Sequence, residues 1–242
     1  MTGLYLYGLI PLPMPRHLSV NGLDKQPVQL KVMDPFVVIF SEAQQDRYLA
    51  SRANLLAHET VLEKVMTEGH PALLPLQFGL VASNWQQFKQ DLLDPKQAEL
   101  LDLLAHLEGK REVGIKVFWN PEQELQLGLA ENLDLQQRRD AMTGKPLGLD
   151  AVVQIGQELE QLLEQRRQAI VDAFVDDLSP LSSDRVEGEL LTENMAYNGA
   201  FLIEWDAEAE FAHRVDTLDQ KFQGRLRIRY NNFTAPYNFT HL

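Results

Sequence analysis

The pair His58-Glu59 is the first place to look for chemistry, because the same pair begins the zinc-binding motif of many metalloproteases. In that motif a second histidine follows one helical turn later, so that both rings face one zinc ion. Here Leu62 occupies that position, and His70 lies beyond Gly69, where glycine favours the end of a helix. The spacing therefore excludes this motif and indicates a polar helix residue whose ring bonds locally.

The other residue patterns that carry known chemistry are incomplete in this sequence. None of the six histidines pairs with another at the spacing of metal ligands. Cysteine is absent, which excludes disulfides, thiolate zinc sites and cysteine nucleophiles. The glycine-rich loops that cradle phosphates and the GxSxG turn that carries a nucleophilic serine are absent too. We therefore predict a protein without a cofactor, without a metal ion and without catalytic residues.

One basic segment, RLRIRY, alternates arginine with apolar residues. Alternate side chains of a strand share a face, so a single face is expected to present Arg225, Arg227 and Arg229. Such a face binds an anion or an acidic partner, or its arginines pair with acids of the same chain. We favour the ion pairs, because Asp and Glu number 35 against 22 Lys and Arg.

The bulk composition restricts the class of protein. A length of 242 residues predicts one or two domains, and 45% hydrophobic residues are typical of a globular chain. The formal charge of -13 disfavours binding to nucleic acid and to anionic membranes. No apolar run approaches the roughly 20 residues that span a bilayer, and the N-terminus lacks the pattern of a signal peptide. These features predict a soluble, cytoplasmic protein.

Residues 1–109 are expected to form a mixed α+β domain. Aromatic and β-branched runs predict strands at Gly3–Ile10 and Val28–Phe40, the second of them broken at Asp34-Pro35. Ser41 is expected to begin a helical region whose apolar residues recur at helical spacing until Gly69. After a short extended segment, Ser83 or Asn84 caps further leucine-rich helix up to Gly109.

Residues 110–242 are expected to form a ferredoxin-like βαββαβ domain with a long helical insert, which makes the whole protein α+β. The order of patterns is strand, helices interrupted at Thr143–Gly148, two strands, helix and strand. The segments that carry this order are Arg111–Trp119, Leu149–Leu178, Asp184–Leu191, Asn198–Trp205, Ala207–Phe222 and Gly224–Tyr230. The aromatic tail, Asn231–Leu242, packs onto the chain's own core or docks a partner.

Six short motifs in order resemble one family over nearly the whole chain, the gas vesicle accessory proteins of the GvpL/GvpF type. They are YLYGL, HETVLEKVM, LPLQFG, GKREVGIKVFW, NGAFLIEW and APYNF. The family commonly ends in a Gly-Pro-rich lead into Pro-Pro-Tyr-x-Phe, whereas this chain has Ala235 before Pro236.

The resemblance implies an assembly factor or minor component of gas vesicles, located in the cytoplasm and at the vesicle, and not an enzyme. Its implied partners are the small hydrophobic shell protein of the GvpA type and other accessory proteins. The residues predicted to bind a partner come from the matching motifs: Tyr5, Tyr7, His58, Glu59, Leu62, Phe78, Trp119, Arg227, Tyr237 and Phe239. The alternative is a small-molecule-binding or enzymatic protein with a ferredoxin-like domain, which needs a concave pocket with convergent polar groups.

Overall fold

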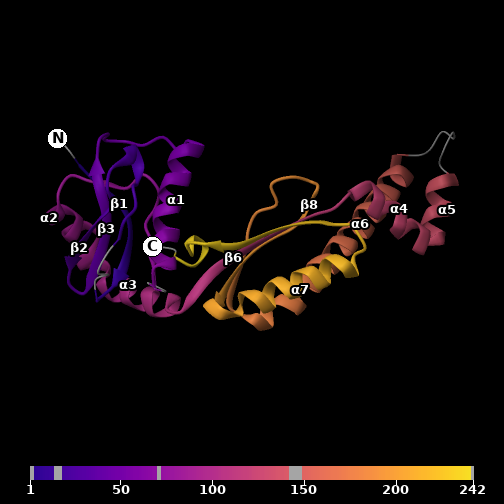
Figure 1. Cartoon of the computed structure of the whole chain (residues 1–242). Coiled ribbons are helices and arrows are strands. Elements are labelled where there is room, and N and C mark those ends of the chain that lie inside the picture. The colour runs from indigo at the N-terminus through magenta and orange to yellow at the C-terminus, as the bar shows by residue number, and fades with distance from the viewer. Residues whose placement is uncertain (1–2, 14–17, 70–71, 142–148, 241–242) are drawn as a thin grey trace. The chain divides into compact units, whose positions relative to one another are not determined.

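The computed structural model describes residues 3–13, 18–69, 72–141 and 149–240 (Figure 1). The chain forms two compact units. The first unit consists of Met1–Val113, Leu202–Glu208 and Asn232–Leu242, and the second of Gly114–Phe201 and Ala209–Asn231. The predicted division into 1–109 and 110–242 assigns the tail to the second domain, whereas the tail lies in the first unit because it packs into that unit's core. The domain boundary itself stays a prediction.

The first unit is built on an antiparallel sheet with the strand order β2-β3-β1-β4, and β5 also pairs with β1. The strands are β1 (Gly3–Pro11), β2 (Gln29–Met33), β3 (Phe36–Ala43), β4 (Leu74–Pro75) and β5 (Val81–Ala82). The strand predicted at the N-terminus and the break at Asp34-Pro35 are both confirmed. Strand β1 is buried along most of its length, as a central strand requires.

The prediction that Ser41 begins a helix is wrong. Ser41 lies within β3, opposite Tyr5 of β1, and its side chain is buried. The hydroxyl groups of Ser41 and Tyr7 are 2.9 Å apart and hydrogen bonded, which accommodates a serine in the core. The helix begins at Arg52 instead, where Ser51 caps it by accepting a hydrogen bond from the backbone N–H of Asn54.

The described part of the first unit has three α-helices, α1 (Arg52–Thr67), α2 (Trp85–Phe88) and α3 (Asp94–Leu107), and a π-helical turn at Lys89–Leu93 joins the last two. Figure 1 shows α1 and α2 on opposite sides of the sheet. The apolar stripe of α1 shares one core with the aromatic residues of β1; it consists of Val61, Leu62, Val65 and Met66. Asn84, one of the two residues predicted to cap this helix, caps α2 by accepting a hydrogen bond from the backbone N–H of Gln87. Gly69 follows α1 with a φ of 96°, a value that favours glycine.

The second sheet has the strand order β7-β8-β6-β9. Its strands are β6 (Lys110–Phe118), β7 (Ser182–Glu187), β8 (Met195–Glu204) and β9 (Arg227–Thr234). Long helices pack on one face of it, α6 (Leu149–Leu178) and α7 (Glu208–Lys221). Aromatic pairs join these layers: the ring centroids of Phe174 and Tyr197 are 6.4 Å apart, and those of Phe201 and Phe211 are 5.3 Å apart.

Helices α4 (Pro121–Glu131) and α5 (Leu133–Ala141) lie beside α6 in the second unit (Figure 1). Gly128 permits the close approach of α4 to α6, because a Cβ atom there would lie 3.1 Å from the Leu162 side chain and 3.0 Å from that of Arg166. The predicted order of strands and helices from Arg111 onward is confirmed. The interruption predicted at Thr143–Gly148 lies outside the described residues. Among the described helices, none is long and apolar enough to cross a membrane.

Candidate functional site

The motif residues converge on an aromatic cluster in the core of the first unit. We define this aromatic cluster by its members: Tyr5, Tyr7, Tyr48, His58, Phe78 and Tyr237. The rings come from β1, from the segments beside α1 and β4, from α1 and from the tail, so the cluster joins parts of the chain that are far apart in sequence. Ring-centroid distances from 4.8 to 6.3 Å are typical of favourable aromatic pairs.

Tyr5 is the polar centre of the aromatic cluster. Its hydroxyl oxygen accepts a hydrogen bond of 3.0 Å from the backbone N–H of Gly79. The same oxygen lies 2.8 Å from Nδ1 of His58, and no other described acceptor bonds with the hydroxyl proton. Tyr5 therefore donates to Nδ1 of His58. Burial raises the pKa of Tyr5 above its ordinary value, so the hydroxyl keeps its proton at neutral pH.

His58 is a buried, neutral histidine. Because Nδ1 accepts from Tyr5, the ring proton of the neutral form is on Nε2. Burial lowers the pKa of His58 to about 4, and the backbone of Leu76 partly offsets that effect. Nε2 is buried and has no hydrogen-bond partner with good geometry among the described residues. The expectation that the ring bonds locally is wrong, because its partner lies 53 residues away.

The neighbouring Tyr7 binds the loop that precedes β2. Its hydroxyl accepts a hydrogen bond of 2.9 Å from the backbone N–H of Leu23 and also bonds with Ser41. A Cβ atom at Gly22 would lie 1.8 Å from this hydroxyl oxygen, so only glycine fits beside it. Gly22 is therefore required by the close approach of its backbone to Tyr7.

Two carboxylates of the first unit hold the tail. Glu59 of α1 accepts a hydrogen bond from the hydroxyl of Thr234 at 2.5 Å. Glu112 of β6 accepts from the backbone N–H of Asn238 at 3.0 Å and from its side-chain amide at 2.6 Å. Burial raises the pKa of Glu112 to about 7, the bonds from Asn238 partly offset this, and the charge of Glu59 adds to it.

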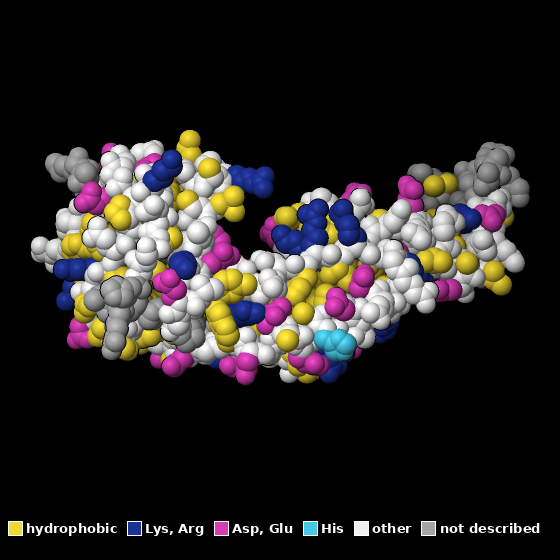
Figure 2. Space-filling model, in the orientation of Figure 1, with side chains coloured by type: hydrophobic (Ala, Val, Ile, Leu, Met, Phe, Trp, Pro, Cys, Tyr) yellow, Lys and Arg dark blue, Asp and Glu magenta, His cyan; other side chains and the backbone are white. Residues whose placement is uncertain are grey.

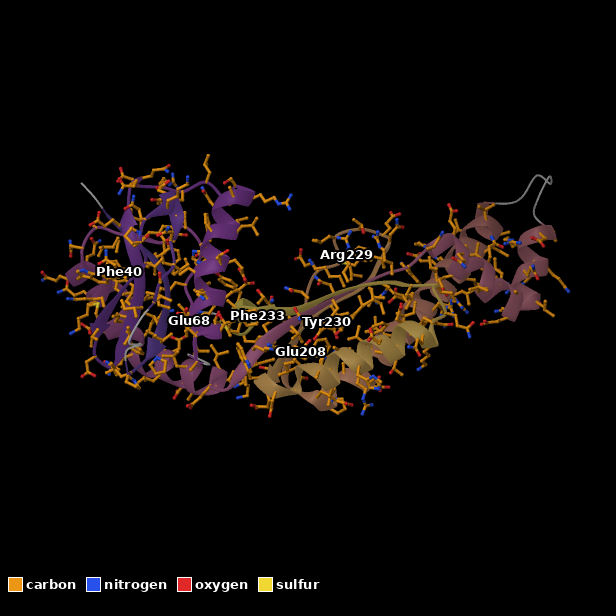
Figure 3. The ribbon with its side chains drawn as sticks, in the orientation of Figure 1. Phe40, Glu68, Glu208, Arg229, Tyr230 and Phe233 are labelled. Atoms are coloured by element: carbon orange, nitrogen blue, oxygen red, sulfur yellow. The ribbon has the colours of Figure 1, made fainter. Side chains whose placement is uncertain are left out.

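Aromatic contacts also hold the tail at Phe233, which is labelled in Figure 3. Its ring meets that of Trp205 edge-on, with centroids 5.5 Å apart. The guanidinium of Arg111 lies over both rings, 5.0 Å from the Trp205 centroid and 5.6 Å from that of Phe233. Ala235 and Phe239 are buried, so the tail packs onto the chain's own core, as one of the two interpretations of its sequence predicts.

The structure brings most of the predicted binding residues together and leaves two apart. Tyr5, Tyr7, His58, Phe78 and Tyr237 form the aromatic cluster, Leu62 belongs to the same core, and Glu59 and Phe239 lie at the docked tail. Trp119 and Arg227 lie in the second unit. Many of these side chains are buried, including Tyr5, Tyr7, His58 and Leu62. Their role in binding a partner stays a prediction.

We expect Tyr5→Phe to lower the free energy of unfolding by about 1–3 kcal/mol, because the amide of Gly79 and the ring of His58 both lose a buried hydrogen-bond partner. Urea unfolding followed by tryptophan fluorescence measures this loss. Tyr237→Phe is the matched control, since the Tyr237 hydroxyl makes no hydrogen bond with a described residue. Equal losses in the two variants would contradict the role assigned to the Tyr5 hydroxyl.

The second unit contains a buried ionic group that the sequence patterns did not indicate. Glu124 of α4 is 1% exposed and accepts hydrogen bonds from two arginines. Nε of Arg166 lies 2.9 Å from one carboxylate oxygen, and the guanidinium of Arg225 donates to both oxygens at 2.7 Å. Arg166 also pairs with Glu131 at the surface. A hollow of about 270 Å³ borders this group, but its charged side chains already pair with one another.

Arg225 therefore does not share a strand face with the other two arginines of its segment, because β9 begins at Arg227. It pairs with an acid of the same chain, as predicted, whereas Arg227 and Arg229 stack on the ring of Phe118. Within the described ranges, no three His, Asp or Glu side chains are grouped as they would be to hold a metal ion.

Comparisons with known proteins give one consistent result. The family described as gas vesicle synthesis protein GvpL/GvpF matches residues 3–241. Gas vesicle protein F of Dolichospermum flosaquae is 50% identical over 239 residues, which are 99% of this chain and 98% of that protein.

Two crystal structures are similar over the whole length. Gas vesicle protein GvpF from Anabaena sp. PCC7120 has a TM-score of 0.88 and 44% identity, covering 100% of this chain and 97% of that one. GvpF from Microcystis aeruginosa has a TM-score of 0.88 and 45% identity, covering 99% of each chain. The chain therefore belongs to the GvpL/GvpF family of gas vesicle synthesis proteins.

Proposed function

We propose that this protein acts in gas vesicle formation by binding the small apolar shell protein, of the GvpA type, and other accessory proteins. The observation that carries this proposal is the match of residues 3–241 to a gas vesicle synthesis family. A small, self-associating apolar subunit exposes surface that makes wrong contacts before assembly. A protein that covers this surface and releases the subunit to the growing shell prevents such contacts. Its role is assembly, not catalysis.

Exposed leucines at the start of α1 support this proposal. Leu49 is 83% exposed, Leu55 is 44% exposed and Leu56 is 55% exposed, although the opposite face of α1 is buried in the core. Leu49 is held beside the helix, because the side chain of Asn54 donates a hydrogen bond of 2.9 Å to its carbonyl oxygen. Large apolar side chains that are exposed at a surface near one another in sequence are typical of a protein interface.

The aromatic cluster packs against the buried face of α1. His58 is anchored to β1 by Tyr5, and Glu59 is anchored to the tail by Thr234. We propose that the motif residues act in this way, by fixing α1 with its leucines at the surface. The predicted binding residues of the second unit lie apart from this cluster: Trp119 is buried, and Arg227 is exposed on β9.

The proposal also includes the fold of the second half of the chain and the location of the protein. The element order from β6 to β9 supports a ferredoxin-like fold with a long helical insert for the second half of the chain. The names of the relatives, which are gas vesicle proteins, support a place at the gas vesicle, and we propose in addition that the protein is present in the cytoplasm and is a minor vesicle component.

The proposal is tested by purifying the tagged full-length protein from cells that co-express the shell protein, and by measuring the molar ratio of shell protein recovered. We expect Leu55→Glu/Leu56→Glu to reduce this ratio at least about tenfold, because each buried leucine is worth about 1.5–3 kcal/mol and tenfold corresponds to about 1.4 kcal/mol. Leu133→Glu on α5 is the control, since Leu133 is 63% exposed in the second unit. No recovery with the unchanged protein, or equal losses in both variants, would overturn the proposal.

A further inference from the structure

Strand β9 presents a basic face that the proposed function does not use. Arg227 and Arg229 are exposed at alternate positions of this strand, and Lys116 is exposed on the neighbouring strand β6. Figure 3 shows Arg229 on one side of β9 and Tyr230 on the other, toward α7. Figure 2 shows Lys and Arg side chains gathered on the same surface. We call Lys116, Phe118, Arg227 and Arg229 the basic strand face.

The two arginines on this face form no ion pair within the described part of a protein that has a large excess of acids. The formal charge is -13, and ion pairs hold most of the described arginines, namely Arg111, Arg138, Arg139, Arg166, Arg167, Arg185, Arg214 and Arg225. Neither Arg227 nor Arg229 pairs with a described acid. The interpretation that they pair with the chain's surplus acids is therefore wrong for both.

Stacking on Phe118 arranges the arginines to bind a carboxylate. The guanidinium of Arg227 lies 4.7 Å from the centroid of the Phe118 ring, and that of Arg229 lies 5.1 Å from it. A guanidinium held by an aromatic ring loses side-chain freedom while its N–H donors remain available for a planar acceptor. Two such groups on one ring form a pair of donors whose spacing is set before any ligand arrives.

Strand β9 is also an edge strand. In the order β7-β8-β6-β9 it pairs with β6 alone, and within the described chain no backbone hydrogen bond outside the sheet reaches Arg227, Ile228 or Arg229. An exposed edge offers backbone N–H and C=O groups to an added strand. In such a strand, side chains two positions apart lie about 6.8 Å apart on one face, which is the repeat that separates Arg227 from Arg229.

We propose that the basic strand face binds an extended, acidic segment of a partner protein, which adds a strand to β9 and places alternate carboxylates against Arg227 and Arg229. The backbone of the segment pairs with the edge of β9, and its carboxylates meet the stacked guanidinium groups. A protein partner is favoured over nucleic acid, because a chain with a formal charge of -13 repels a continuous phosphate backbone. The proposal concerns a surface other than the leucines of α1 and does not depend on them.

A fluorescent seven-residue peptide with glutamate at alternate positions and valine or threonine between them is the probe. Anisotropy titration against the full-length protein at about 100 mM salt measures its affinity, because ionic contacts are only partly screened there. We expect Arg227→Gln/Arg229→Gln to weaken binding at least about tenfold, since both guanidinium groups lose their charge-assisted hydrogen bonds to the carboxylates of the peptide. Arg47→Gln/Arg52→Gln is the matched control, because Arg47 and Arg52 are exposed and have no described ion pair. This variant should bind within about twofold of the unchanged protein.

Two modified probes separate the parts of the proposal. A peptide with glutamine in place of glutamate tests the carboxylates, and one with N-methylated backbone amides tests strand addition; both should bind several-fold more weakly. A single-stranded oligonucleotide of equal charge tests the other class of partner. Failure of the acidic peptide to bind, equal binding by the two double variants, equal binding of the N-methylated peptide, or tighter binding of the oligonucleotide would each overturn the proposal. The recovery of shell protein described above is measured separately, so either result stands alone.

Discussion

Replacing Glu112 by glutamine is expected to make the stability of the protein rise steeply with pH, by about 3 kcal/mol between pH 4.5 and pH 6.5. Replacing His58 by asparagine is expected to make the stability fall with rising pH over the same range. The unchanged protein should show little of either effect, because these two buried groups of the first unit respond to protons in opposite directions.

Glu112 favours folding at low pH. Its ordinary pKa is 4.5 and burial raises it to about 7, so between these values the folded protein holds a proton that the unfolded chain has released. The contribution of this group to stability is fully present below pH 4.5 and is lost as the pH rises through about 7. Each pKa unit of the shift corresponds to about 1.4 kcal/mol.

His58 favours folding at high pH. Its ordinary pKa of 6.5 is lowered to about 4 by burial, so between these values the unfolded chain binds a proton that the folded protein does not. Its contribution is fully present above pH 6.5 and is lost as the pH falls through about 4. From pH 4.5 to 6.5 the gain from one group therefore offsets the loss from the other.

The measurement is a series of urea unfolding curves from pH 4.5 to pH 7.5, followed through Trp85 and Trp205, which lie in the first unit. His58→Asn keeps an acceptor for the hydroxyl of Tyr5, and Glu112→Gln keeps an acceptor for the amide of Asn238. Glu63, whose pKa burial also raises, is the same in all three proteins and adds an equal background. Parallel curves for the variants and the unchanged protein would show that neither group titrates as its burial requires.

The second large effect is expected at Glu124. Glu124→Ala leaves the guanidinium groups of Arg166 and Arg225 without their shared carboxylate, at a place where the Arg166 side chain is only 15% exposed. Breaking a buried ion pair from one side costs about 3–5 kcal/mol, and the partial exposure of Arg225 reduces this to about 3 kcal/mol. The loss falls on the second unit, because Glu124 joins α4 to α6 and to Arg225, two residues before β9.

Glu131→Ala is the matched control for Glu124. Glu131 pairs with the same arginine, Arg166, at 2.8 Å, but its side chain is 69% exposed. An exposed ion pair is worth about 0–1 kcal/mol and weakens further in salt, so this variant should unfold almost as the unchanged protein does. Urea unfolding at low and at high salt measures both variants. A Glu131 variant as unstable as the Glu124 variant would contradict the distinction between the buried and the exposed pair.

The secondary structure of this protein follows largely from local pattern. The period of two in Arg111–Trp119 and the helical spacing in Leu149–Leu178 each predict an element that the structure contains. Ser41 shows where such patterns fail. A serine before an acidic residue is a good helix cap, but pairing with β1 carries the strand through Ser41, and the hydroxyl of Tyr7 satisfies its side chain.

The sequence predicted some residues of the candidate site and did not predict the buried glutamates. The family motifs contain Tyr5, His58 and Tyr237, and the structure brings these three into one aromatic cluster. Glu112 lies in the motif GKREVGIKVFW and Glu124 lies outside the motifs, and nothing in the sequence marks either one as buried, because a glutamate in a strand or helix is ordinarily an exposed residue. Each is buried by a segment far along the chain, Glu112 by Asn238 and Glu124 by Arg225.

The sequence by itself determined the family, the order of the elements, and the absence of the common catalytic and cofactor motifs. Each of these depends only on residue types and on short spacings between them. Only the tertiary structure decided which side chains meet. It pairs His58 with Tyr5 across 53 residues and Glu112 with Asn238 across 126 residues, and it separates Arg225 from Arg227 and Arg229. Periodicity acts over a few neighbouring residues, whereas burial and pKa depend on strand register and packing between distant segments.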